Sequence, residues 1–165
     1  MSTLLPTGDD IASEAVRSVA RRGFHDTLPE VARNGFVMAQ FLRLVEEVGE
    51  YRYASSLYSF GSIESELADI MIVLCQLAWS YGVEPVLLLR KPVEFGRGRQ
   101  TWATRLEWLA RHMRKNDLDN VRSAIRGIAI QCHEEAAYLK IDLQKAIGAK
   151  LKADEQRGRL HGEVI

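Results

Sequence analysis

Five carboxylates in two short groups are the residues of this chain best suited to chemistry. Glu46, Glu47 and Glu50 form the first group, and Glu66 and Asp69 form the second. Residues three and four positions apart share one face of a helix, so each group predicts neighbouring carboxylates on a helix surface. Two such faces packed together would collect the oxygen ligands that Mg²⁺ prefers. Without a cation the same charges would repel one another, so the spacing predicts a metal site.

The second group lies in a segment that is apolar around almost its whole circumference. Residues 63–81 predict a helix whose narrow polar strip consists of Ser65, Glu66, Asp69, Gln76 and Ser80. Such a helix is a buried central helix, and we expect it to form an interface between subunits as well as a core. Its two acids must face a confined polar cleft, because an unpaired buried charge is costly.

The first group lies in a helical pattern that begins near Gly35, after a connection over residues 24–34. Its apolar stripe consists of Val37, Phe41, Leu44, Val45 and Val48. The three acids lie opposite this stripe, so taken alone they are typical of a solvated face. A turn around Gly61, with Ser62 as the next N-cap, folds residues 36–82 into an acidic hairpin. The combination of the two helices, more than either alone, favours a metal site.

The rest of the chain also follows a helical pattern. We expect a first helix capped by Asp9 or Asp10 and ended by Gly23. Further helices are predicted over residues 84–90, 100–115 and 118–139, and again after Asp142. No segment has the alternation of a half-buried strand. The 165 residues therefore predict one all-α domain, a helical bundle.

A weak similarity links two parts of the chain. Residues 67–85 align without gaps on residues 125–143, with the identities Ile70/Ile128, Ile72/Ile130 and Ala78/Ala136. In this alignment the acids are lost, since Glu66 falls on Ala124 and Asp69 on Gly127. Residues 99–160 then form a second helical segment that is a degenerate repeat. The alternative is that residues 83–125 are an insertion.

The composition is that of an ordinary globular protein, with 47% hydrophobic and 27% charged residues and a formal net charge of zero. This balance gives no support to a nucleic-acid partner. Residues 1–10 lack the features of a secretory signal, and the longest apolar run is shorter than the roughly 20 residues that span a bilayer. We therefore expect no membrane partner and a cytoplasmic location. Cys75 and Cys132 are expected to be buried free thiols.

The acidic motifs resemble those of the MazG-like all-α nucleoside triphosphate pyrophosphohydrolases, a superfamily that includes dimeric dUTPases and phosphoribosyl-ATP pyrophosphatase. The family pattern is EExxE followed by ExxD, and all five acids are present. The chain end looks like the closing helix of the family, which usually reads K-x-x-x-N-E-x-R. Lys150, Glu155 and Arg157 match this pattern, while Asp154 stands where Asn is usual. The matches leave residues 83–125 outside a single-copy alignment.

The resemblance implies a Mg²⁺-dependent hydrolase, with Mn²⁺ as a possible substitute, that converts a nucleoside triphosphate into the monophosphate and pyrophosphate. It also implies a homodimer or homotetramer. The metal would be held by Glu47, Glu50, Glu66 and Asp69. Glu46 would orient or deprotonate the attacking water, because a carboxylate beside a metal can accept its proton.

Four further residues would bind the nucleotide according to the same resemblance. Lys150, Asp154 and Arg157 share one stripe of the closing helix, and His25 precedes the first acidic helix. The two cations are equally typical of a solvated helix end, and His25 of a loop histidine without a role. The alternative function is a catalytically silent bundle that acts as a nucleotide sensor or a protein-interaction scaffold.

Overall fold

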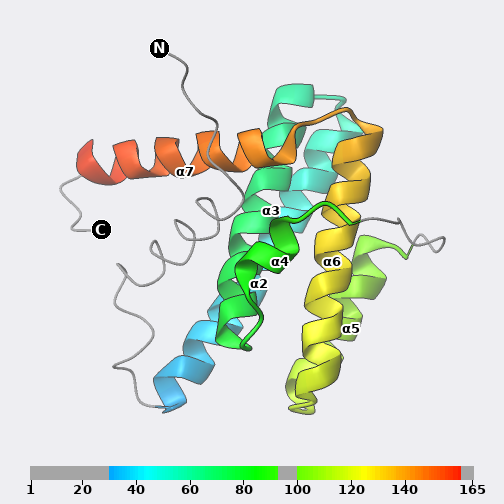
Figure 1. Cartoon of the computed structure of the whole chain (residues 1–165), viewed down its shortest axis with the longest axis vertical. Helices are drawn as coiled ribbons and strands as arrows, with labels where there is room; N and C mark the ends of the chain where they lie inside the picture. Colours follow the sequence, from blue (N-terminus) through cyan, green and yellow to red (C-terminus); the bar gives the residue numbers. More distant parts are fainter. Residues whose placement is uncertain (1–29, 93–99, 161–165) are drawn as a thin grey trace.

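The computed structural model describes residues 30–92 and 100–160, with side chains for 34–92 and 100–156, and every regular element in these ranges is an α-helix. The elements are α2 (Glu30–Ser56), α3 (Phe60–Ser80), α4 (Pro85–Leu89), α5 (Trp102–Arg114), α6 (Leu118–Tyr138) and α7 (Leu143–Leu160) (Figure 1). The predicted all-α bundle is confirmed. The helix expected between Asp9 and Gly23 lies outside the described residues. None of the described helices is long and apolar enough to cross a membrane.

Two helix boundaries differ from the prediction. The helix α2 begins at Glu30 instead of near Gly35, so its first turns lie in the segment expected to be a connection. The helix α3 begins at Phe60, and its N-cap is Ser59 instead of Ser62. The reason is that the chain reverses at Tyr58, whose φ is 52°, and the next helix follows at once.

The bundle consists of two helical hairpins whose second helices meet in the centre. The helices α2 and α3 form one hairpin, α5 and α6 form the other, and α3 packs against α6. Figure 1 shows α4 in front of the bundle and α7 crossing it at one end. The helix α4 contacts α3 and also α6, and α7 contacts α3. The last helix of the chain therefore packs on the first hairpin.

The prediction of a buried central helix is confirmed for α3. Every residue from Leu67 to Ala78 is buried. Over this stretch α3 has no apolar surface left for a partner, and its role in a subunit interface stays a prediction. Large exposed apolar side chains lie instead on α2, among them Met38 and Leu42 at 52% and 60% exposure.

The face of α2 that enters the core is rotated relative to the predicted stripe. Leu44 and Val48 are buried as expected, but Val45 is 40% exposed. Glu47, expected on the solvated side, is only 9% exposed. The reason is that α3 packs on the side of α2 that carries Leu44, Glu47, Val48 and Tyr51, which recur at helical spacing.

The two hairpins have the same register along the chain, with a constant offset of 58 positions. Corresponding boundaries are Ser56 and Arg114 for the first helices, Phe60–Ser80 and Leu118–Tyr138 for the second helices, and Pro85 and Leu143 for the start of the third. The left-handed residues correspond as well: Tyr58 (φ 52°) with Asn116 (φ 53°), and Gly82 (φ 69°) with Lys140 (φ 56°).

The hydrogen bonds that close the helices repeat at the same offset. The amide of Val83 donates to the carbonyl of Ala78 over 2.9 Å, and the amide of Ile141 donates to that of Ala136 over 2.8 Å. The gapless alignment of residues 67–85 with 125–143 therefore extends over both turns of each hairpin. This geometry favours a repeat over an insertion.

Candidate metal centre

Three of the five predicted acids come together between α2 and α3. Glu47 projects from the side of α2 that faces α3, and Glu66 and Asp69 lie on the polar strip of α3. One carboxylate oxygen from each of the three lies within 4.8 Å of the other two. Ligands on opposite sides of Mg²⁺ are about 4.2 Å apart, since each Mg–O distance is about 2.1 Å. Side-chain shifts of less than about 1 Å would therefore bring these oxygens to a single cation.

The other two predicted acids lie at the edge of this cluster. The charge of Glu50 raises the pKa of Glu66, so the carboxyl group of Glu50 lies close to the cluster. Glu46 is exposed on α2. Together with Glu50 and Glu66 it lines a cavity of about 520 Å³, whose wall also includes Tyr53, Leu57, Ser59 and Ser62. The acids thus extend from a buried centre to an open cavity.

The electrostatics show that the centre carries more negative charge than its surroundings accommodate. Burial, followed by the charge of Asp69, raises the pKa of Glu47 from its ordinary value of 4.5 to about 7. Burial and Asp69 also raise the pKa of Glu66. For Asp69, burial raises the pKa even though Lys150 lowers it. A bound cation would relieve this repulsion, so the donor set fits a hard divalent ion.

A lysine from the last helix reaches into the centre. Lys150 Nζ lies 2.6 Å from Asp69 Oδ2 and donates to Ser65 Oγ over 3.1 Å. Burial lowers the pKa of this lysine, but the contact with Asp69 and the charges of Asp154 and Glu66 together raise it overall. Lys150 therefore balances part of the negative charge, in contact with one of the acids that would bind the metal.

The remaining predicted binding residues have different outcomes. Asp154 lies one turn after Lys150 on α7, and its negative charge raises the pKa of Asp69, so it is close to the centre. Arg157 belongs to α7, but its side chain lies outside the described residues. His25 also lies outside them.

Sequence reasoning missed Arg43 as part of the centre. Arg43 Nη2 lies 3.7 Å from Glu47 Oε1, one helical turn away along α2. Its charge lowers the pKa of Glu47, against the larger effect of burial. The spacing of four residues between an arginine and a glutamate was the available signal.

A second and larger cavity of about 600 Å³ contains none of the five acids. It is lined by Arg52, by residues 100–103 at the start of α5, and by Gln131, Glu134, Glu135 and Tyr138 of α6. Arg52 follows Glu50 by two positions, which places it about 200° around the helix. The two cavities therefore open on different sides of α2.

Comparisons of this chain with known protein families, with curated proteins and with solved structures found no match.

Proposed function

We propose that the protein is a Mg²⁺-dependent nucleoside triphosphate pyrophosphohydrolase, which converts a nucleotide, most simply a deoxynucleoside triphosphate, into the monophosphate and pyrophosphate. The observation that carries this proposal is the convergence of Glu47, Glu66 and Asp69 from two helices onto one gap. Their spacing in the sequence is the EExxE and ExxD pattern of the MazG-like resemblance. Manganese, a similar oxygen-seeking ion, is expected to substitute.

Each residue of the centre has a role in this proposal. Magnesium held by Glu47, Glu50, Glu66 and Asp69 would neutralise phosphate oxygens and lower the pKa of a bound water. Glu46, exposed at the adjoining cavity, would accept a proton from that water. Lys150, which pairs with Asp69, would be available to bind a phosphate oxygen once a cation balanced the charge of Asp69.

The proposal is tested by incubating the pure protein with a panel of ribo- and deoxynucleoside triphosphates and Mg²⁺. We expect the release of pyrophosphate and not of orthophosphate. Asp69→Asn and Glu50→Gln should each lower turnover by at least about 100-fold, because each removes a charged ligand. The matched control is Glu64→Gln, since Glu64 is an exposed acid on α3 outside the cluster.

The alternative of a silent nucleotide sensor or scaffold makes a different prediction. It would give nucleotide binding, or none, without pyrophosphate from any member of the panel. Circular dichroism and light scattering must show that the variants keep their helical content and their oligomeric size. Under that control, unchanged turnover in Asp69→Asn would refute the proposed centre.

We also propose a cytoplasmic location and, as the family resemblance implies, a homodimer or homotetramer. The exposed apolar side chains of Met38, Leu42 and Val45 follow one another at helical spacing on α2 and are the first candidates for the contact. Light scattering of wild type and of Leu42→Glu tests this, with a smaller assembly expected for the variant.

A further inference from the structure

The shared register of the two hairpins assigns a counterpart in α5 and α6 to every acid of the centre. The pairs are Glu46 with Thr104, Glu47 with Arg105, Glu50 with Trp108, Glu66 with Ala124, and Asp69 with Gly127. All five counterparts lack a carboxylate. The core behaves differently, because buried positions correspond to buried positions: Leu67 with Ile125, Ile70 with Ile128, Leu74 with Cys132, and Leu89 with Ile147.

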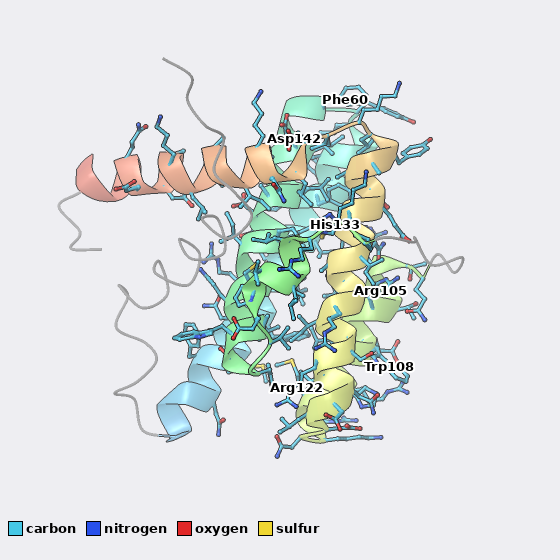
Figure 2. The ribbon with its side chains drawn as sticks, viewed as in Figure 1. Phe60, Arg105, Trp108, Arg122, His133 and Asp142 are labelled. Atoms are coloured by element: carbon cyan, nitrogen blue, oxygen red, sulfur yellow. The ribbon has the colours of Figure 1, made fainter. Side chains whose placement is uncertain are left out.

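Arg105, the counterpart of Glu47, fills the space beside Gly127, the counterpart of Asp69. A Cβ atom added to Gly127 would lie 2.6 Å from Nη1 of Arg105, which is closer than real side chains approach. Any larger side chain at position 127 would therefore require the guanidinium to move. Figure 2 labels Arg105 on α5, beside α6, and Trp108 further along the same helix. In the first hairpin, the corresponding gap is lined by Glu47, Glu66 and Asp69.

The second hairpin also lacks the lysine that the first receives. The helix α7 extends from Leu143 to Leu160 and brings Lys150 to Asp69. The corresponding helix of the first unit, α4, ends at Leu89, and the counterpart of Lys150 is Pro92. Among the described residues, α7 therefore completes only the first centre.

We propose that the α5–α6 hairpin is a second copy of the α2–α3 hairpin whose cation centre has been closed by Arg105. The guanidinium occupies the volume between the two helices that corresponds to the gap lined by Glu47, Glu66 and Asp69, where a metal would bind in the first copy. The chain is then a fused pair of units with one divalent-cation site, assembled from the acids of the first unit and Lys150 of the second. This inference rests on the proposed metal centre of the first hairpin.

The test rebuilds the missing centre with three substitutions, Arg105→Glu, Ala124→Glu and Gly127→Asp, which copy Glu47, Glu66 and Asp69 into the second hairpin. The probe is Mn²⁺, and its stoichiometry is measured by titration calorimetry and by the electron paramagnetic resonance signal of the free ion. We expect the number of bound ions per chain to double relative to wild type. A rebuilt protein with wild-type helical content and unchanged stoichiometry would overturn the proposal.

A second measurement covers the case in which the rebuilt protein does not fold. Glu47→Gln with Asp69→Asn removes ligands of the first centre alone, and this double variant should lose all specific Mn²⁺ binding. Ions that remain bound with wild-type affinity would show that the second hairpin still holds a metal, and would overturn the proposal. Failure of the proposed metal centre gives a different result. Wild type would then bind no Mn²⁺, whereas the rebuilt protein would bind one ion at its second hairpin.

Discussion

Replacement of Glu47 by glutamine should stabilise the protein when no divalent cation is present. Glu47 is 9% exposed, and burial and Asp69 raise its pKa from 4.5 to about 7. A raised pKa means that the folded protein binds the proton more tightly than the unfolded chain does. The ionised form therefore destabilises the fold, and the stability associated with the proton is lost as the pH rises from 4.5 through 7.

The magnitude follows from the size of the pKa shift. One pKa unit corresponds to about 1.4 kcal/mol, so the full shift corresponds to about 3 kcal/mol above pH 8. This shift already includes the opposing charge of Arg43, so the expected gain in Glu47→Gln at pH 8 is the full value of about 3 kcal/mol. At pH 5 the expected gain is below about 1 kcal/mol, because most of the penalty is not yet present. For a chain of this size, the gain at pH 8 raises the Tm by about 6–12 °C.

The assay is thermal unfolding followed by circular dichroism, in chelator, at pH 8 and at pH 5. Glu64→Gln, on the exposed side of α3, is the control for the loss of one negative charge. Added Mg²⁺ should reduce the advantage of Glu47→Gln, since the ion stabilises wild type by mass action. A lower Tm for the variant at pH 8 in chelator, or an equal gain at both pH values, would refute the reasoning.

Three further predictions concern the packing. His133, labelled in Figure 2, donates from Nε2 to the carbonyl of Leu88 over 2.8 Å, and burial lowers its pKa. Its contribution to stability is therefore present above about pH 6.5 and is lost as the pH falls. The difference in the free energy of unfolding between wild type and His133→Gln should shrink from pH 7.5 to 5.5 in denaturant titrations. Gly82→Ala should lower the free energy of unfolding by about 1 kcal/mol and Lys140→Gly should raise it by up to about 1 kcal/mol, because both positions have positive φ. A change of Tm in the same direction for both variants would contradict this. Ile128→Ala should cost about 2–5 kcal/mol in denaturant titrations, because Ile128 is fully buried, and a loss below about 1 kcal/mol would contradict its place in the core.

Sequence patterns correctly predicted those features of the fold that depend only on residues close together in the chain. The apolar circumference of residues 63–81 predicted the buried helix α3, because a helix that is apolar on all sides has to be covered. The spacing of Glu66 and Asp69 predicted that both lie on one face, since helical geometry alone decides this. The short helix α4 and the breaks at Gly82 and Asn116 were also predicted, because backbone conformations at turns depend on few residues.

The sequence pattern did not predict which face of α2 is buried, because the apolar residues of this helix allow more than one face to pack. Val45 and Glu47 exchanged their expected environments, because the position of α3 decides which side of α2 is buried. The start of α2 at Glu30 was missed as well. Burial of an acid is unfavourable by itself, so no propensity predicts it.

The sequence by itself determined that the chain is all-α, that α3 is central and that five carboxylates stand at chelating spacing, since these follow from the 3.6-residue period of the helix. Only the tertiary structure decided that Glu47 turns inward, that Lys150 of α7 meets Asp69 of α3, and that Arg105 fills the space beside Gly127. These contacts join residues far apart in the chain or on separate helices. Packing of the whole bundle sets their distances, and no local spacing encodes them.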